Sequence, residues 1–364
     1  MLNIKLLLIT NKIESKPRGG RQMLQRINYL ILKEIFHNNL RVVELNREKK
    51  KLIYYFSSLV GKIDGINSKK IKEINNLIEK EEINRVFIDG SNLGLLAKKI
   101  KKIKPKIKIS TFFHNVETVF FWGLFMYNKS IKSLLICIIN YFAEKNSCKY
   151  SDELICLSKN DSNILNKMFK NNLYTHISPI SLIDRYSKSE NIHNQLHKKK
   201  YALFVGTNFY SNLDGIYWFS KNVAQFIDID ILVIGAGYEK LQKKTKNLKN
   251  IIFIGGVDKI SDYYKGSQFV IAPIFSGSGM KTKVAEALMF GKQIVGTKQS
   301  FIGYENIIAE VGYICEKPSE FIKKISELSK KSINFTNDEL RSIYIKNYSY
   351  ESALQRFKII FNKD

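Results

Sequence analysis

The chain reads Ala272-Pro-Ile-Phe-Ser-Gly-Ser-Gly-Met-Lys-Thr-Lys-Val-Ala-Glu-Ala-Leu-Met-Phe-Gly291 in its second half. The apolar run that ends at Pro273 predicts a buried strand, and the loop behind it carries Gly277 and Gly279. A helix is expected to begin near Met280. A strand, a glycine loop and a helix in this order predict one unit of a parallel α/β sheet, with backbone that a ligand can approach closely.

The residues around that loop suit an anionic ligand. N–H groups at the start of a helix favour phosphate, and Lys281 and Lys283 add positive charge beside them. Glu286 lies further along the helix, where its carboxylate can accept hydrogen bonds from a ribose diol. Phosphate and diol recognition together indicate a nucleotide-sugar site; the alternative is a plain loop followed by a solvated helix face.

Strand-like and helix-like patterns alternate along most of the chain on both sides of this stretch. Such alternation predicts parallel sheets with helices on both faces, that is, an α/β protein with two doubly wound, Rossmann-like domains. We expect strands over Ile4–Ile9, Arg41–Leu45, Arg85–Ile88, Ile107–Phe113, Glu153–Leu157, Tyr201–Val205, Asp230–Ile234, Ile251–Ile254, Phe269–Ile274 and Gln293–Gly296. The expected helices include Gly20–Phe36, Ile71–Lys80, Leu213–Phe226 with Asn212 as N-cap, Lys281–Phe290, Asn337–Ile345 and Tyr350–Phe361.

A polar, charged stretch over residues 185–200 lacks an apolar period and predicts a linker. It divides the 364 residues into an N-terminal domain over 1–184 and a C-terminal domain over 201–347, which contains the expected nucleotide-sugar site. A last helix over about 348–364 is expected to pack back onto the first domain. Ligands of open α/β sheets bind at the carboxyl ends of the strands, so a cleft between the domains is the expected site.

Composition excludes several classes of protein. Apolar residues make up 45% and charged residues 25%, which is typical of a globular protein and excludes disorder as the main state. Four cysteines without C-x-x-C spacing exclude a disulfide scaffold and indicate reduced core residues rather than a metal site. Lys+Arg 59 against Asp+Glu 33 leaves +26, which attracts phosphorylated substrates, anionic lipid or nucleic acid. Coding bias is the alternative, because Lys, Asn and Ile are all abundant.

The longest apolar region, Val116–Phe142, is interrupted by Tyr127-Asn-Lys-Ser130 and by Lys132. It therefore falls short of a membrane span. We favour a pair of core helices there, with contact to a membrane surface as the alternative. The apolar run Ile4–Ile9 is too short for a signal peptide. We expect a cytoplasmic protein, with a peripheral position on the inner membrane face as one option.

The stretch quoted first resembles the donor-binding motif of GT-B glycosyltransferases of the "glycosyl transferases group 1" type, retaining family 4. The likeness continues in the family's order over most of residues 201–310, through Phe204-Val-Gly-Thr207, Val233-Ile-Gly-Ala-Gly237, Phe253-Ile-Gly-Gly-Val257 and Gly291-Lys-Gln-Ile-Val-Gly-Thr297. The resemblance implies the GT-B fold and transfer of a hexose-type sugar from a UDP-sugar or GDP-sugar, with no metal and no cofactor. It implies a donor site made of Gly206, Thr207, Gly277, Ser278, Gly279, Met280, Lys281, Thr282, Lys283 and Glu286.

The resemblance implies that the N-terminal domain is the acceptor side, and two features of that domain fit it. Gly19 and Gly20 follow the first strand and open a helix, where the family places a glycine loop near the donor phosphate and the acceptor. His114 ends a strand, similar to the family's histidine that faces the donor sugar. The resemblance thus implies that His114, Lys283 and Glu286 form the catalytic set.

Three positions depart from the family pattern. Glu286 matches the second of the motif's two glutamates, but Ser278 stands at the first, which in the family contacts the donor sugar. Thr207 and Asp214 stand where many relatives carry Arg and Lys. The diphosphate charge must then be met by other cations, and our candidates, in order, are Lys283, Lys281 and either Arg18 or Arg21.

Transfer from such a donor builds negative charge on the leaving diphosphate, which helix N–H groups and lysines stabilise. In a retaining reaction the leaving phosphate takes the acceptor proton, so His114 orients the sugar. In an inverting reaction, His114 or Glu117 is the candidate base.

Two general features of the sequence suggest the class of the acceptor. Basic charge and the apolar cluster Phe120-Phe-Trp-Gly-Leu-Phe-Met126 suggest a lipid-linked saccharide at the inner leaflet, in the synthesis of O-antigen or capsule. Alternatives are a catalytically degenerate partner subunit, because Ser278 replaces a glutamate, a GT-B epimerase, and a nucleic-acid-binding protein. We expect no nucleic acid partner, because the basic residues are spread along the whole chain.

Overall fold

The computed structural model describes residues 4–17, 19–46, 58, 61–170, 174–187, 199–245, 247–331 and 336–362. It divides into two compact units, each built around a sheet of its own. Unit 1 consists of Met1–Leu182 and Tyr350–Asp364, and unit 2 consists of Ile183–Ser349. Residues 188–198, most of the expected linker, lie outside the described residues.

Unit 1 contains a six-stranded parallel sheet in the order β2-β1-β3-β4-β5-β6. Its strands are β1 (Leu6–Asn11), β2 (Leu40–Leu45), β3 (Arg85–Asp89), β4 (Lys108–Phe113), β5 (Glu153–Cys156) and β6 (Thr175–Ile177). Its helices are α1 (Gly20–Phe36), α3 (Ser68–Lys80), α4 (Gly94–Ile103), α5 (Glu117–Asn128), α6 (Ile131–Tyr150), α7 (Lys159–Phe169) and α15 (Tyr350–Phe361), with short 3-10 turns η1 (His37–Asn39) and η2 (Ser91–Leu93).

Unit 2 contains a second six-stranded parallel sheet in the order β12-β11-β10-β7-β8-β9. Its strands are β7 (Tyr201–Val205), β8 (Asp230–Ile234), β9 (Ile251–Gly255), β10 (Val270–Ala272), β11 (Ile294–Gly296) and β12 (Gly312–Ile314). Its helices are α8 (Tyr210–Asn222), α9 (Glu239–Lys244), α10 (Ile260–Gly266), α11 (Thr282–Met289), α12 (Ile308–Val311), α13 (Pro318–Ser329) and α14 (Asp338–Tyr348), with 3-10 turns η3 (Ala224–Phe226), η4 (Lys298–Phe301) and η5 (Glu305–Ile307). The prediction of two doubly wound α/β sheets is confirmed.

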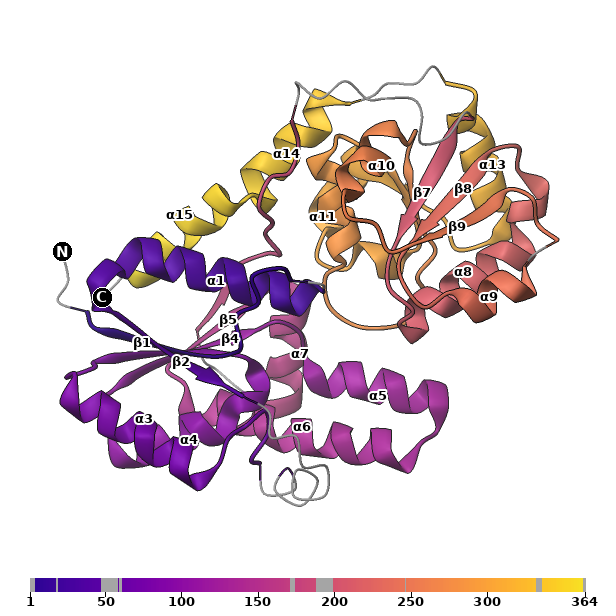
Figure 1. Cartoon of the computed structure of the whole chain (residues 1–364). Coiled ribbons are helices and arrows are strands. Elements are labelled where there is room, and N and C mark those ends of the chain that lie inside the picture. The colour runs from indigo at the N-terminus through magenta and orange to yellow at the C-terminus, as the bar shows by residue number, and fades with distance from the viewer. Residues whose placement is uncertain are drawn as a thin grey trace. The chain divides into compact units, whose positions relative to one another are not determined.

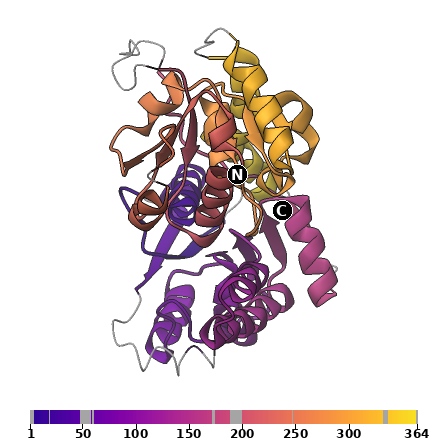
Figure 2. The same ribbon diagram turned by 90° about the vertical axis from the view of Figure 1, so that its right-hand side faces the viewer.

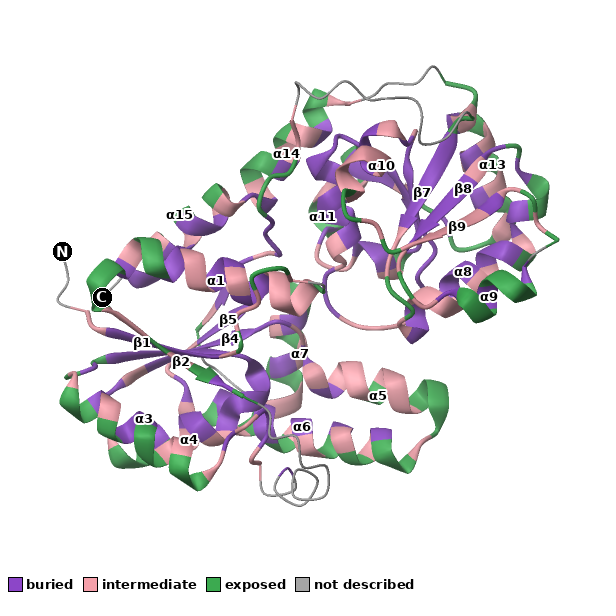
Figure 3. Ribbon diagram, viewed as in Figure 1, coloured by how far each residue is buried: buried purple, intermediate pink, exposed green. Residues whose placement is uncertain are grey.

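Helices cover both faces of the unit 1 sheet, which explains why its inner strands β1, β3, β4 and β5 are buried along most of their length. Figure 1 shows α1 and α15 on one side of this sheet and α3 and α4 on the other. Figure 2, turned by 90°, shows the indigo α1 and the purple helices on opposite sides of the strands. Every residue of β3 is buried, and the strands of both units are drawn mainly in the colour of buried residues in Figure 3.

Aromatic rings hold α15 against unit 1. The Phe361 ring meets Phe36 of α1 edge-on at 5.0 Å between centroids, and Phe357 lies 6.0 Å from Phe87 of β3. Arg356 donates a hydrogen bond to Ser181 Oγ at 2.8 Å. The last helix of the chain is thus part of the core of the unit that contains its first strand.

Three local expectations are wrong. Helix α8 begins at Tyr210, so Asn212 lies inside it rather than at its N-cap. The two edge strands β6 and β12 were missed because each has only three residues. The apolar region Val116–Phe142 does form two helices, α5 and α6, but they are not a buried pair, because Thr118 is the only buried residue of α5. Among the described residues, no helix is long and apolar enough to cross a membrane.

Candidate donor site and strand-end histidine

The loop between β10 and α11 depends on its two glycines. Gly277 and Gly279 have φ values of +98° and +68°, a region that side chains with a Cβ rarely adopt. Lys281 Nζ donates hydrogen bonds to the carbonyls of Ser278 at 3.1 Å and Gly279 at 2.8 Å, and Gln299 donates to the carbonyl of Gly277. The ammonium of Lys281 therefore closes the loop on itself, which weakens its candidacy as a diphosphate ligand.

Lys283 connects α11 with the turn that follows β7. Its Nζ donates a hydrogen bond to Asn212 Oδ1 at 2.8 Å, and Asn212 Nδ2 donates to the carbonyl of Thr207 at 2.9 Å. A Cβ at Gly206 would lie 2.7 Å from Asn212 Nδ2, so this turn needs a glycine to admit the amide. Asn212, an unsuccessful N-cap candidate, thus links the Gly206–Thr207 turn to the first turn of α11.

Burial, together with the positive charge of Lys281 and against the opposing effect of Glu286, lowers the pKa of Lys283 to about 7. The Nζ lies 4.0 Å from the centroid of the Phe204 ring, an arrangement that favours a cation over the ring face. An amine in such a place gains its full charge when an anion arrives. Lys283 is therefore well suited to meet a phosphate.

Glu286 is buried on α11 with both carboxylate oxygens engaged. Oε1 accepts a hydrogen bond from Arg185 at 2.5 Å, and Oε2 accepts one from the hydroxyl of Tyr264 at 3.1 Å. Tyr264 stacks on Phe290 with 5.1 Å between the ring centroids. A carboxylate has about four acceptor positions, so these two donors orient Glu286 and leave room for ligand hydroxyls.

His114 lies directly behind β4 in unit 1, beside the buried carboxylate of Asp89 at the end of β3. The distance from His114 Nε2 to Asp89 Oδ1 is 2.8 Å. Asp89 also accepts hydrogen bonds from Asn28 at 2.9 Å and Thr10 at 2.9 Å. Burial by itself opposes ionisation, but His114, Asn28 and Thr10 outweigh it and hold the pKa of Asp89 below its usual value. Asp89 thus places a buried negative charge beside the imidazole.

The glycine pair of unit 1 opens α1. Gly19 is the N-cap residue, and a Cβ built on it would meet nothing within 4 Å, so space is open there. Arg21 donates hydrogen bonds to Asn92 at 3.1 Å and Asp64 at 3.4 Å, and lies 3.8 Å from Glu117. Arg21 is therefore paired with side chains of its own unit. Arg18 lies outside the described residues.

Residues 199–331 match the model of a protein family described as "Glycosyl transferases group 1". This part of the chain is a glycosyltransferase domain. The matched segment lies in unit 2 and contains the whole loop from β10 to α11. The match confirms the group 1 resemblance that the motifs indicated.

Individual proteins match a larger share of the chain than the family model does. An uncharacterised 44.6 kDa protein in the cps region of Klebsiella pneumoniae is 26% identical over 273 residues, which are 69% of this chain and 67% of that protein. The crystal structure of Anabaena HepE in complex with UDP superposes with a TM-score of 0.71 at 12% identity, over 99% of this chain and 100% of that one. The lipopolysaccharide outer core galactosyltransferase WaaB, in its apo form, has a TM-score of 0.66 at 12% identity over the same shares. These structures establish the GT-B fold for this chain.

The geometry sorts the expected site residues of the glycosyltransferase into two sets. In unit 2, hydrogen bonds join Lys283 to the Gly206–Thr207 turn, Met280 packs under Gly303, and Thr282 begins α11. The unit 1 set consists of Gly19, Gly20 and His114. The sequence motifs did not predict Arg185, Tyr264 and Asp89 as site residues. Of these only Asp89, as a carboxylate at a strand end, carried a usable signal.

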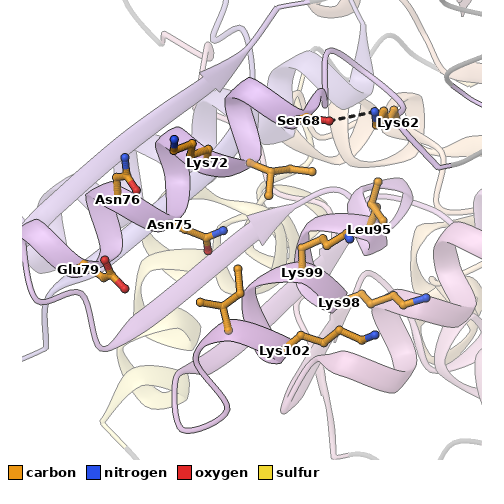
Figure 4. Close-up of a pocket in the computed structure, with 12 residues that line it drawn as sticks. Lys62, Ser68, Lys72, Asn75, Asn76, Glu79, Leu95, Lys98, Lys99 and Lys102 are labelled. Atoms are coloured by element: carbon orange, nitrogen blue, oxygen red, sulfur yellow. Dashed lines mark hydrogen bonds between the residues drawn. The ribbon is translucent and has the colours of Figure 1, made fainter.

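A cavity of about 830 Å³ lies elsewhere in the glycosyltransferase, between α3 and α4 (Figure 4). Its lining contains none of the expected site residues and includes the lysines Lys62, Lys72, Lys98, Lys99 and Lys102. Among the described residues, no group of three or more His, Cys, Asp or Glu could hold a metal ion. All four cysteines are buried thiols, as expected.

Proposed function

We propose that this glycosyltransferase moves a hexose-type sugar from a nucleotide diphosphate, with UDP as the first nucleotide to test, to a lipid-linked saccharide acceptor in bacterial surface polysaccharide synthesis. The observation that carries the proposal is the pairing, on one short helix, of a buried lysine with a buried carboxylate held in place by Arg185 and Tyr264. HepE is solved with UDP and with UDP-glucose, which supports a UDP-sugar donor. WaaB and the cps-region protein support surface polysaccharide as the product class.

Each group has a role in the proposed reaction. Lys283 and the start of α11 meet the diphosphate, Glu286 accepts hydrogen bonds from the ribose hydroxyls, and His114 orients the sugar. The bond between the anomeric carbon and the diphosphate oxygen breaks, and a bond to the acceptor oxygen forms. The acceptor oxygen attacks from the face that the diphosphate leaves, so the reaction retains configuration, and the acceptor proton passes to the leaving diphosphate. Lys283 supplies positive charge to that diphosphate without a metal.

The first experiment is a calorimetric titration of the parent and of Glu286→Ala with UDP, GDP and their common sugars. We expect selective binding of one nucleotide, weakened about 10- to 100-fold in the variant, because a charge-assisted hydrogen bond is lost. Glu239→Ala, at an exposed position of α9, is the control and leaves the affinity unchanged.

Two outcomes would count against the proposal. Absence of binding to every nucleotide would favour the degenerate partner subunit, for which the serine at position 278 is the motivating observation. Binding that survives Glu286→Ala unchanged would remove the ribose role. A nucleotide bound without release of free nucleotide diphosphate in the presence of lipid-linked saccharides would leave a binding protein rather than a transferase.

A further inference from the structure

Helix α6 exposes large apolar side chains and buries small or polar ones. Its buried positions carry small or polar side chains, namely Ser133, Cys137, Asn140, Ala143, Glu144, Ser147 and Cys148. Its exposed positions carry Ile131, Leu135, Ile138 and Phe142, spaced at i, i+4, i+7 and i+11, which places them in one stripe along the helix. A helix of a soluble domain turns its apolar stripe inward. The outward stripe of α6 therefore indicates that another apolar medium covers it.

Neighbouring helices of the same unit show the ordinary arrangement. Helix α4 buries Leu96 and Ile100 and exposes Lys99 and Lys102. Helix α3 likewise buries Ile74 and Ile78. The outward apolar stripe is thus particular to α6 and is no general property of this Lys-rich and Ile-rich sequence.

Helix α5 extends the apolar surface. Its Trp122 and Met126, one turn apart, are both about half exposed, as is Tyr127. Figure 1 shows α5 and α6 side by side as a helical hairpin, and Figure 3 shows exposed residues at its tip. Tryptophan and tyrosine are the side chains that favour the boundary between lipid and water.

Internal hydrogen bonds fix the hairpin to unit 1. The carboxylate of Glu144 accepts hydrogen bonds from the backbone N–H groups of Glu117 at 2.7 Å and Thr118 at 3.0 Å, at the start of α5. It also accepts from the hydroxyls of Thr118 at 2.6 Å and Ser91 at 2.9 Å. The polar side of α6 is therefore satisfied within the protein, which leaves the apolar side for a partner.

The charges of the hairpin favour an anionic partner. Between residues 118 and 143 the only Asp, Glu, Lys, Arg or His side chains are Lys129 and Lys132, both exposed at the turn between the helices. Lys145 and Lys149 continue the face of the apolar stripe at i+14 and i+18 from Ile131. Helix α4, whose lysines line the cavity of Figure 4, packs against α6. An apolar stripe bordered by lysines matches the surface of a bilayer that contains anionic lipid.

We propose that the α5–α6 hairpin docks this glycosyltransferase on anionic membrane, with Ile131, Leu135, Ile138 and Phe142 entering the interface and Lys129 and Lys132 contacting lipid phosphates. This inference deepens the proposed function, because it rests on a lipid-linked acceptor and names the surface that brings the enzyme to it.

Vesicle co-sedimentation of the full chain tests the proposal, with phosphatidylcholine alone or with about 30% phosphatidylglycerol as the probe, since anionic lipid is what attracts basic segments. We expect binding to the anionic vesicles only. Phe142→Ser should weaken it about tenfold, because a half-exposed aromatic ring no longer enters the interface. Phe226→Ser is the matched control, since Phe142 is 58% and Phe226 is 60% exposed.

A second pair of variants tests the charges. Lys129→Gln/Lys132→Gln should weaken vesicle binding roughly thirtyfold, since a lysine near an anionic surface contributes about 1 kcal/mol. Lys240→Gln/Lys243→Gln, with the same spacing on the exposed side of α9, should leave binding unchanged. All four variants should keep the parent affinity for UDP, which shows that they are folded.

Two results would overturn the proposal. One is parent protein that stays in the supernatant with every vesicle. The other is a dimer, measured by light scattering, that dissociates in Phe142→Ser while vesicle binding is absent, because a second copy would then cover the stripe. Nucleotide binding with no vesicle binding would refute the docking surface alone, whereas vesicle binding without nucleotide binding would refute the proposed function alone.

Discussion

Lys283 is a buried lysine of the expected donor site, and its charge changes near neutral pH. Its pKa of about 7 leaves it largely neutral at pH 9 and mostly protonated at pH 6. A bound diphosphate favours the protonated form, so donor binding above pH 7 takes up a proton. We expect Lys283→Ala to weaken UDP binding roughly thirtyfold at pH 6, since a hydrogen bond to a charged group contributes about 2 kcal/mol.

Calorimetry at pH 6 and pH 9 measures both effects. The parent should bind UDP more weakly at pH 9, and Lys283→Ala should lose that pH dependence. Lys298→Ala, an exposed lysine at the start of η4, is the control. Equal affinity of the parent and Lys283→Ala at pH 6 would transfer the diphosphate role to another cation.

His114 is expected to act on turnover rather than on nucleotide affinity, because its assigned contact is with the sugar. His114→Ala should lower kcat about 100-fold and leave the affinity for UDP within about threefold, as expected for loss of one orienting hydrogen bond. Asp89→Asn should lower kcat less, since it removes the charge beside the imidazole but keeps an acceptor. Steady-state kinetics with UDP-sugar, beside calorimetry with UDP, separates the two. A His114→Ala enzyme with parental kcat would assign the histidine to the core.

At the scale of elements, α15 supplies part of the hydrophobic core of unit 1. Phe357 is 1% exposed and its ring lies within 6.3 Å of Phe87, Phe112 and Phe361. Phe357→Ala should therefore lower the free energy of unfolding by about 3–5 kcal/mol through the cavity that it leaves. Ile359→Ala, two positions away and exposed, should change it by less than about 0.5 kcal/mol. Denaturant titration of both variants checks this, and equal midpoints would mean that α15 adds no core.

At the scale of the whole molecule, buried ionisable groups shape the dependence of stability on pH. Burial raises the pKa of Glu144 to about 7. Its contribution to the stability of the folded state is therefore complete below the unfolded pKa of 4.5 and is lost as pH rises to 7. Burial lowers the pKa of Lys283 and of Lys292 to about 7. The two buried ammonium groups therefore destabilise the folded state most below pH 7, and this destabilisation disappears as pH rises toward 10.5. These groups together predict a minimum of stability near pH 7.

Urea midpoints between pH 5 and pH 9.5 measure that minimum. Glu144→Gln should make the urea midpoint less dependent on pH below pH 7. Lys283→Met should reduce the rise of the midpoint with pH above pH 7. Saturating UDP should reduce the slope above pH 7 as well, because the bound anion restores the charge of Lys283. A flat profile in the parent would mean that water or local opening relieves the burial of these groups.

Much of the fold and part of the site could be predicted from the sequence. Apolar runs such as Tyr201–Val205 and Asp230–Ile234 gave the bounds of β7 and β8, because strands buried on both faces leave little room for polar residues. Gly277 and Gly279 could be predicted to form a turn, because the positive φ values there favour glycine. The short edge strands β6 and β12 could not, since three residues carry too little periodicity.

By itself, the sequence determined two parallel α/β sheets, the glycine loop and the positions of Lys283 and Glu286 on one helix, because these follow from local periodicity and backbone sterics. Only the tertiary structure decided which partners these groups have. Arg185 and Tyr264 reach Glu286 from 101 and 22 residues away, and no local pattern encodes such contacts. The outward stripe of α6 is likewise a tertiary fact: periodicity fixes that four apolar side chains share one face, whereas packing fixes which way that face turns.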